Sequence, residues 1–200
     1  MSFACLLGEF YGFWSMRAFA CVALLPSTLL LLAIAIAGRR AQSTLARPEL
    51  AQAATWIREG AIGGVVAAIA YDLFRVPFVL NGYPLFKVFP EFGRMLLDSS
   101  EPQWLVHAVG WTYHFSNGAA LGIMFLCLLP RAVPKTYWMA GVAWAMLVET
   151  ILLLTPYRDF FKIAMPFTTF LVLTASAHAI FGMALGAWCA RRMPRVPAVD

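Results

Sequence analysis

The chain has 200 residues, of which 62% are hydrophobic and 12% are charged, and its mean hydropathy is +0.75. Charged residues make up about a quarter of an average soluble domain, so this composition excludes an ordinary soluble globular protein. The net charge of +5 comes mainly from arginines in short segments between apolar stretches. That distribution is typical of membrane topology signals, and we expect no nucleic-acid partner.

Five apolar windows follow one another along the chain, and each predicts a transmembrane helix. They lie at residues 18–38, 60–80, 104–129, 136–155 and 164–190. Each can cross the hydrocarbon core of a bilayer, which takes about 20 helical residues. The sequence therefore predicts an all-α, polytopic membrane helix bundle that forms a single domain over residues 1–200.

The first window also has features of a signal peptide, because it ends in the small residues Ala35-Ile36-Ala37. Its apolar run is longer than a usual signal core. The segment before it contains the acidic Glu9 and a single basic residue, Arg17. We therefore expect this helix to be retained.

The basic residues of the short connecting segments predict the orientation. Segments 39–59, 130–135 and 191–200 carry nine Lys and Arg residues, whereas the segments on the opposite side carry five. The more basic side faces the cytoplasm in most membrane proteins. We therefore expect the N-terminus outside and the C-terminus in the cytoplasm.

Phenylalanines recur at three-residue spacing in the outer segment 83–98, with charged residues between them. The pattern consists of Phe86, Phe89 and Phe92 with Lys87, Glu91 and Arg94. It predicts a short amphipathic helix that lies in the membrane interface. The alternative is a lid over an outward-facing cavity.

Ionisable side chains inside the apolar windows are the candidate site, because a charge in a span costs several kcal/mol unless it is paired or hydrated. Asp72, His114, Glu149 and His178 lie roughly 9 to 21 Å from the outer end of their helices at about 1.5 Å per residue. A single cluster of these four residues is therefore geometrically feasible. The candidate residues around it are Arg75, His107, Trp111, Asn117 and Ser176.

Glycines share helix faces with both central histidines, at the spacing that marks close helix contact. The expected helix-packing glycines are Gly60, Gly64, Gly110, Gly118, Gly122, Gly182 and Gly186. The pattern His-x-x-x-Gly-x-Ala-Leu-Gly occurs at residues 114–122 and again at residues 178–186. This repetition favours a duplication that relates the second and third spans to the fourth and fifth. The alternative is coincidence among helices rich in glycine and alanine.

Four functions remain open for the acid and histidine residues. They could bind a divalent transition metal or relay protons, since imidazole and carboxylate groups suit both tasks. His114 and His178 could instead be axial ligands of haem b. In the fourth reading Asp72 pairs with Arg75 and the polar groups only hold the bundle together.

The chain carries no known catalytic signature, and whether it is an enzyme stays open. Its four cysteines form no CxxC pair, which disfavours a thiol oxidoreductase. It has no phosphate-binding glycine loop, HExxH or GxSxG pattern. Besides membrane lipid, we consider two kinds of partner. The chain could be an accessory or assembly subunit of a larger membrane complex, or it could associate with further copies of itself.

Three motifs resemble those of the YagU-type group of small bacterial inner-membrane proteins. They are His107-x-x-x-Trp111-x-x-His114-x-Ser116, Leu154-Thr155-Pro156, and a last helix that holds a His/Gly pair and ends in Arg191-Arg192. The resemblance covers about the last two thirds of the chain. It implies a helical fold and a location in the bacterial inner (cytoplasmic) membrane. The group has no established biochemical activity, so the resemblance implies little about the reaction.

Overall fold

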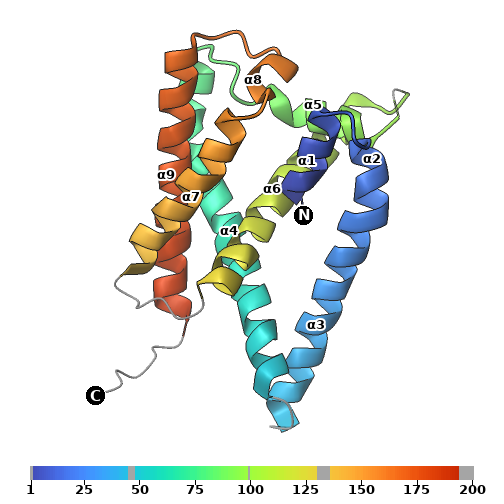
Figure 1. Cartoon of the computed structure of the whole chain (residues 1–200), viewed down its shortest axis with the longest axis vertical. Helices are drawn as coiled ribbons and strands as arrows, with labels where there is room; N and C mark the ends of the chain where they lie inside the picture. Colours follow the sequence, from blue (N-terminus) through green and yellow to red (C-terminus); the bar gives the residue numbers. More distant parts are fainter. Residues whose placement is uncertain (1, 45–47, 99, 130–135, 194–200) are drawn as a thin grey trace.

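The computed structural model describes residues 2–44, 48–98, 100–129 and 136–193, and these form helices joined by short connections (Figure 1). The long helices are α3 (Leu25–Thr44), α4 (Pro48–Leu80), α6 (Gln103–Leu128), α7 (Tyr137–Leu153) and α9 (Phe167–Arg192). The short ones are α1 (Ser2–Phe10), α2 (Met16–Phe19), the π-helical η1 (Ala20–Leu24), α5 (Val88–Leu96) and α8 (Tyr157–Phe160). No strand occurs in the described ranges, which confirms the all-α class.

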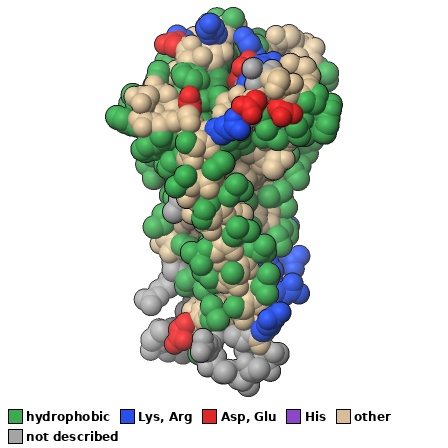
Figure 2. All heavy atoms as spheres, turned by 90° about the vertical axis from the view of Figure 1, so that its right-hand side faces the viewer, with side chains coloured by type: hydrophobic (Ala, Val, Ile, Leu, Met, Phe, Trp, Pro, Cys, Tyr) green, Lys and Arg blue, Asp and Glu red, His purple; other side chains and the backbone are tan. Residues whose placement is uncertain are grey.

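Three helical stretches are long and apolar enough to cross a membrane, namely Met16–Arg40, Pro48–Leu80 and Phe167–Arg192. Tyr137–Leu153 is apolar but shorter. Helix α6 has 26 residues and is not among these three stretches. The face shown in Figure 2 is mostly apolar in its middle part, with charged side chains toward its upper and lower parts. These features indicate a membrane location, and the count of five spans stays a prediction.

Two helix pairs, α4 with α6 and α7 with α9, cross with their backbones in contact. A Cβ atom added to Gly64 would collide with the carbonyl oxygen of Gly118, and one added to Gly141 would collide with that of Gly182. No side chain fits at either crossing, so the helices approach closely enough for polar residues near the crossing to meet.

Helix α9 also packs against α4 and thereby joins the two pairs. Gly63 of α4 lies under the side chains of Trp188 and Leu185. The apolar core at this junction is formed by Ala67, Ala68, Phe181 and Leu185 together with residues of α6 and α7. The junction between the pairs is therefore made largely by side chains.

Helix α5 lies within the predicted outer segment 83–98, and its phenylalanines are packed on protein. Phe89 and Phe92 are buried, and Phe89 packs against Trp111 of α6 with ring centroids 4.2 Å apart. Residues of α1, α8 and the start of α9 complete this second core. The burial agrees with the lid alternative, while the placement of the segment in the membrane interface stays a prediction.

Helix α3 contacts the rest of the molecule mainly at one end. Gly38 packs against the backbone of Leu50 and the side chain of Ala54 on α4. From this contact α3 diverges from α4 toward η1 and α2 (Figure 1). Its apolar side chains, including Leu29, are largely exposed.

Candidate functional site

Asp72 of α4 and His114 of α6 form the first carboxylate-histidine pair. The close approach of the two helices brings His114 Nε2 within 2.8 Å of Asp72 Oδ2. Asp72 is buried, at 7% exposure. A carboxylate that bonds one ring nitrogen fixes the tautomer and the orientation of an imidazole.

Arg75 lies one turn after Asp72 and is the only arginine or lysine in the cavity lining described below. Its Nη1 is 3.5 Å from Asp72 Oδ1, and its Nη2 donates a hydrogen bond to the carbonyl of Leu85. The guanidinium carbon lies 4.8 Å from the ring centroid of Tyr71 and 5.5 Å from that of Phe89. This arginine, at 5% exposure, is therefore held by an acid, a carbonyl and aromatic faces.

Glu149 of α7 and His178 of α9 form the second pair. His178 Nδ1 lies 2.9 Å from Glu149 Oε2 and also 2.9 Å from the carbonyl oxygen of Thr174. The ring N–H is aligned with the Thr174 carbonyl, so Glu149 Oε2 has no well-aligned donor among the described residues. At 2% exposure, Glu149 is the most deeply buried of the four candidate residues.

The Thr174 hydroxyl completes the second pair. It lies within hydrogen-bonding distance of Glu149 Oε1 and 2.9 Å from the carbonyl oxygen of Phe170. A hydroxyl carries one proton, so it can donate to only one of these oxygens at a time.

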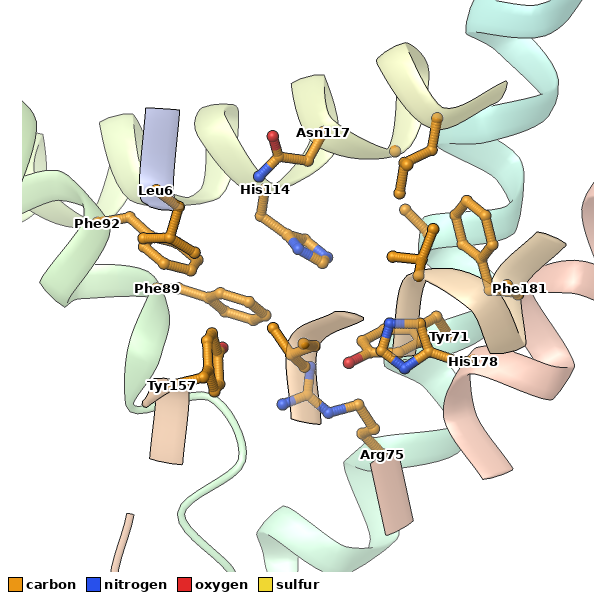
Figure 3. A pocket seen from close by; sticks show the side chains of 16 residues that line it. Leu6, Tyr71, Arg75, Phe89, Phe92, His114, Asn117, Tyr157, His178 and Phe181 are labelled. Atoms are coloured by element: carbon orange, nitrogen blue, oxygen red, sulfur yellow. The ribbon is translucent and has the colours of Figure 1, made fainter. Parts of the chain in front are cut away.

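The histidine of each pair lines one cavity of about 120 Å³, whereas the carboxylates Asp72 and Glu149 do not belong to its lining (Figure 3). His114, His178, Tyr71 and Arg75 converge on it from α4, α6 and α9. The ring of Tyr71 lies between the two histidines, with centroid distances of 6.1 Å to His114 and 5.1 Å to His178. The remaining walls are mostly apolar, and the cavity therefore presents polar groups at a few fixed points.

Three short helices, α1, α5 and α8, contribute residues that close one end of the cavity, and we call them the capping helices. Phe89 and Phe92 of α5, Leu6 of α1 and Tyr157 of α8 belong to its lining. Burial raises the pKa of the Tyr157 hydroxyl above its ordinary value, so this group stays protonated at neutral pH. At this end Phe89 packs on His114, with ring centroids 4.4 Å apart.

The structure divides the four predicted ligands into two pairs, so the predicted single metal site is not formed. Among the described residues, no group of three or more His, Cys, Asp and Glu side chains could hold a metal ion. Each histidine lies beside one carboxylate, because each helix pair brings together only its own acid and imidazole. Two protein ligands are fewer than the three or four that transition-metal sites such as zinc use.

The geometry also does not suit a haem held between His114 and His178. The cavity of about 120 Å³ is smaller than the roughly 300–1,000 Å³ of ordinary cofactor pockets. In addition, Nε2 of His114 is engaged by Asp72. A macrocycle would require the two helix pairs to separate.

The other predicted site residues have varied surroundings. Asn117 lines the cavity, and its Oδ1 has no hydrogen-bond partner among the described residues. Trp111 packs beside His114, with ring centroids 5.9 Å apart. His107 is exposed, and Ser176 is half-buried outside the cavity lining.

The predicted helix-packing glycines lie at helix contacts. Gly60, Gly64, Gly118 and Gly122 lie between α4 and α6, and Gly182 and Gly186 lie between α7 and α9. Gly110 faces the backbone of α5 at Phe89. The prediction treated Gly110 as part of one stripe with Gly118 and Gly122, but α5 occupies the outer part of that stripe.

Sequence reasoning missed Tyr71 and Thr174. Tyr71 precedes Asp72 directly and was counted only as part of an apolar window. Thr174 lies four residues before His178 and therefore on the same helix face, a spacing that could have identified it.

No protein-family model, no curated protein and no solved structure matches this chain. The site is therefore interpreted from its own residues and geometry.

Proposed function

We propose that this chain is an integral membrane protein that holds and exchanges protons at its central cavity. The observation that carries the proposal is the buried Glu149, whose ion-pair partner among the described residues is His178. Asp72 is already balanced by Arg75. With both imidazoles neutral, Asp72, Arg75 and Glu149 together carry one negative charge without compensation.

One proton on the pair of Glu149 and His178 removes that imbalance. An uncompensated charge buried in protein or in the membrane costs several kcal/mol, so the pair is most stable when it carries this proton. The proton can reside on the carboxyl or on the imidazole, because both groups accept one. The pair therefore acts as a store for a single exchangeable proton.

The Thr174 hydroxyl suits both positions of this proton. When Glu149 is ionised, the hydroxyl donates to its Oε1. When Glu149 is protonated, the carboxyl can donate to the hydroxyl oxygen, and the hydroxyl donates to the Phe170 carbonyl instead. Rotation of one hydroxyl thus accommodates both states without movement of a helix.

The cavity offers the proton a route between the two pairs. Tyr71 lies between His114 and His178, and its hydroxyl can both donate and accept a hydrogen bond. A cavity of this volume can take several waters, since roughly 10–15 Å³ is enough for one. A chain of these groups would relay a proton between the Glu149 and Asp72 sides of the bundle.

The proposal includes the origin and topology of the bundle. Gly64 and Gly141 occupy the same position relative to the acid that follows eight residues later, and Gly118 and Gly182 each follow their histidine by four residues. This correspondence supports a duplication of one helix pair, with the first span as an addition. We further propose five spans with the N-terminus outside, in the bacterial inner membrane, in accordance with the YagU-type resemblance.

Proton flux into proteoliposomes tests the proposal. Vesicles that contain a pH-sensitive dye would receive a potassium diffusion potential, and the internal pH would be followed with wild type, Glu149→Gln and His178→Asn. We expect both variants to lower the protein-dependent flux on the order of 10²-fold, the typical effect of removing a proton-transfer group. The matched control is His107→Asn, which removes an exposed histidine outside the cavity and is expected to keep the wild-type flux.

An accessory role in a larger complex gives a different outcome. In that case wild-type vesicles would show no more flux than empty vesicles, and the protein would co-purify in mild detergent with a stable partner that the Glu149→Gln variant retains. Such a result would overturn the proton-exchange proposal.

A further inference from the structure

A groove of about 420 Å³ lies between α3 on one side and α4 and α6 on the other. It exists because α3 contacts α4 at Gly38 and then diverges from it (Figure 1). Its walls include Leu31, Ala35 and Ile36 of α3 and Ala61 of α4. The groove does not share residues with the cavity that holds the histidines.

The polar groups in the groove wall are already satisfied by their own helices. The hydroxyl of Thr28 donates to the carbonyl of Leu24 at 2.8 Å, and that of Thr55 donates to the carbonyl of Ala51 at 2.9 Å. Ser116 likewise bonds a carbonyl of α6. The groove therefore offers an occupant apolar contact and few free hydrogen-bonding groups, as a hydrocarbon chain requires.

Basic side chains stand at the narrow end of the groove. Arg39 and Arg58 both belong to its lining and both are exposed. Arg58 pairs with Glu59, with Nη2 2.9 Å from Oε1, whereas no ion pair of Arg39 occurs among the described residues. This end thus keeps a net positive charge beside an apolar channel.

The spacing of apolar and basic residues along the groove matches the spacing of the acyl chain and the phosphate in a lipid. Leu31 and Arg39 are eight residues apart on one helix, which is about 12 Å along the axis. Arg39 lies at the end of the apolar stretch Met16–Arg40, where the polar surface of a bilayer would lie. An acyl chain along Leu31 and Ala35 would therefore place a phosphate group near Arg39.

We propose that this groove binds one anionic glycerophospholipid, with an acyl chain between α3 and α4 and its phosphate at Arg39 and Arg58. Basic residues at the membrane surface bind anionic headgroups, and the apolar walls hold the chain. The lipid would fill the space that α3 leaves open and so fix α3 against the bundle. This site is independent of the proton-exchange proposal.

Native mass spectrometry tests the site. The protein would be equilibrated in mild detergent with equal amounts of palmitoyl-oleoyl phosphatidylglycerol and phosphatidylcholine. We expect wild type to retain phosphatidylglycerol preferentially as a one-to-one complex. Arg39→Gln is expected to lower this retention roughly fivefold, which is the effect of one basic residue at a membrane surface. The double variant Arg39→Gln/Arg58→Gln is expected to lose the preference for phosphatidylglycerol over phosphatidylcholine. Arg191→Gln is the control, because it removes an exposed arginine outside the groove and is expected to leave retention unchanged.

Filling the groove tests the position of the acyl chain. Ala35→Phe should reduce retention of both lipids, whereas Ala37→Phe, on an exposed part of the same helix, should not. Ala61→Phe on the opposite wall provides a second groove-filling variant if Ala35→Phe does not fold. Equal retention of both lipids by wild type, or an equal loss with Arg191→Gln, would refute the proposal. A lipid-free dimer in place of the lipid-bound monomer would also refute it, by showing that a second copy covers the groove.

Discussion

Replacing Asp72 with Asn leaves the buried guanidinium of Arg75 without its acid. Arginine does not lose its proton in proteins, so the charge stays. At 3.5 Å and an effective dielectric constant of about 20, the attraction between Arg75 and Asp72 is about 5 kcal/mol. The aromatic rings and the Leu85 carbonyl still hold the guanidinium. We therefore expect Asp72→Asn to lower the free energy of unfolding by about 3 to 5 kcal/mol.

The reverse change should cost less. Arg75→Met leaves Asp72 beside His114, which can take a proton and supply the missing positive charge. We expect a loss of about 1 to 3 kcal/mol in the free energy of unfolding. In the double variant Asp72→Asn/Arg75→Met no charge is left unpaired. Its loss should therefore be smaller than that of Asp72→Asn alone.

Reversible unfolding in mixed micelles of sodium dodecyl sulfate and a mild detergent measures these differences. The control is Glu91→Gln, which breaks a surface pair with Arg94 and should change the free energy of unfolding by at most about 1 kcal/mol. The reasoning fails if Asp72→Asn costs no more than this control. It also fails if the loss in the double variant equals the sum of the two single losses.

Three further predictions concern packing and pH. Gly141→Ala should lower the free energy of unfolding by about 1 to 3 kcal/mol, because its Cβ meets a carbonyl of α9. The control Ala143→Val, on the exposed side of α7, should change the free energy of unfolding by no more than about 0.5 kcal/mol. Equal effects of the two substitutions would contradict the backbone contact. Phe89→Ala should cost about 3 to 5 kcal/mol in the same assay, since it empties the core between α5 and α6, and a loss below about 1 kcal/mol would contradict this. Burial, with a smaller effect of a nearby acid, raises the pKa of the Cys5 thiol from 9.0 to about 11, so its contribution to stability is complete below pH 9 and is lost as the pH rises toward 11. Cys5→Ala should flatten the decline in stability between these pH values, and an unchanged decline would exclude this thiol as its cause.

The positions of the long helices could be predicted from the sequence because helix formation in an apolar segment depends on local composition. Four of the five apolar windows coincide closely with a long helix of the structure or with part of one, and the window 18–38 covers the end of α2, η1 and most of α3. The short helix α1 was not predicted, since it lies outside all five apolar windows. Its Cys5 and Leu6 belong to a buried cluster that includes residues of α5, α6 and α9, which are distant in sequence.

The pairing of the polar residues depends on information that a single sequence does not carry. Depth along a helix follows from residue number, and it placed Asp72, His114, Glu149 and His178 at comparable levels. The rotation of each helix about its axis and the order of the helices around the bundle do not follow from residue number. These two variables decide that each acid meets the histidine of its own helix pair, and that Tyr71 lies between the two pairs.

The glycine crossings also determine where this bundle can open. At Gly64 with Gly118, and at Gly141 with Gly182, backbone meets backbone, so neither pair has side chains there that could adopt another packing. The junction between the pairs is made by side chains such as Trp188 and Leu185, which can change rotamer. A movement that admits water or a ligand to the histidines would therefore displace the two pairs along this junction, where side chains can repack.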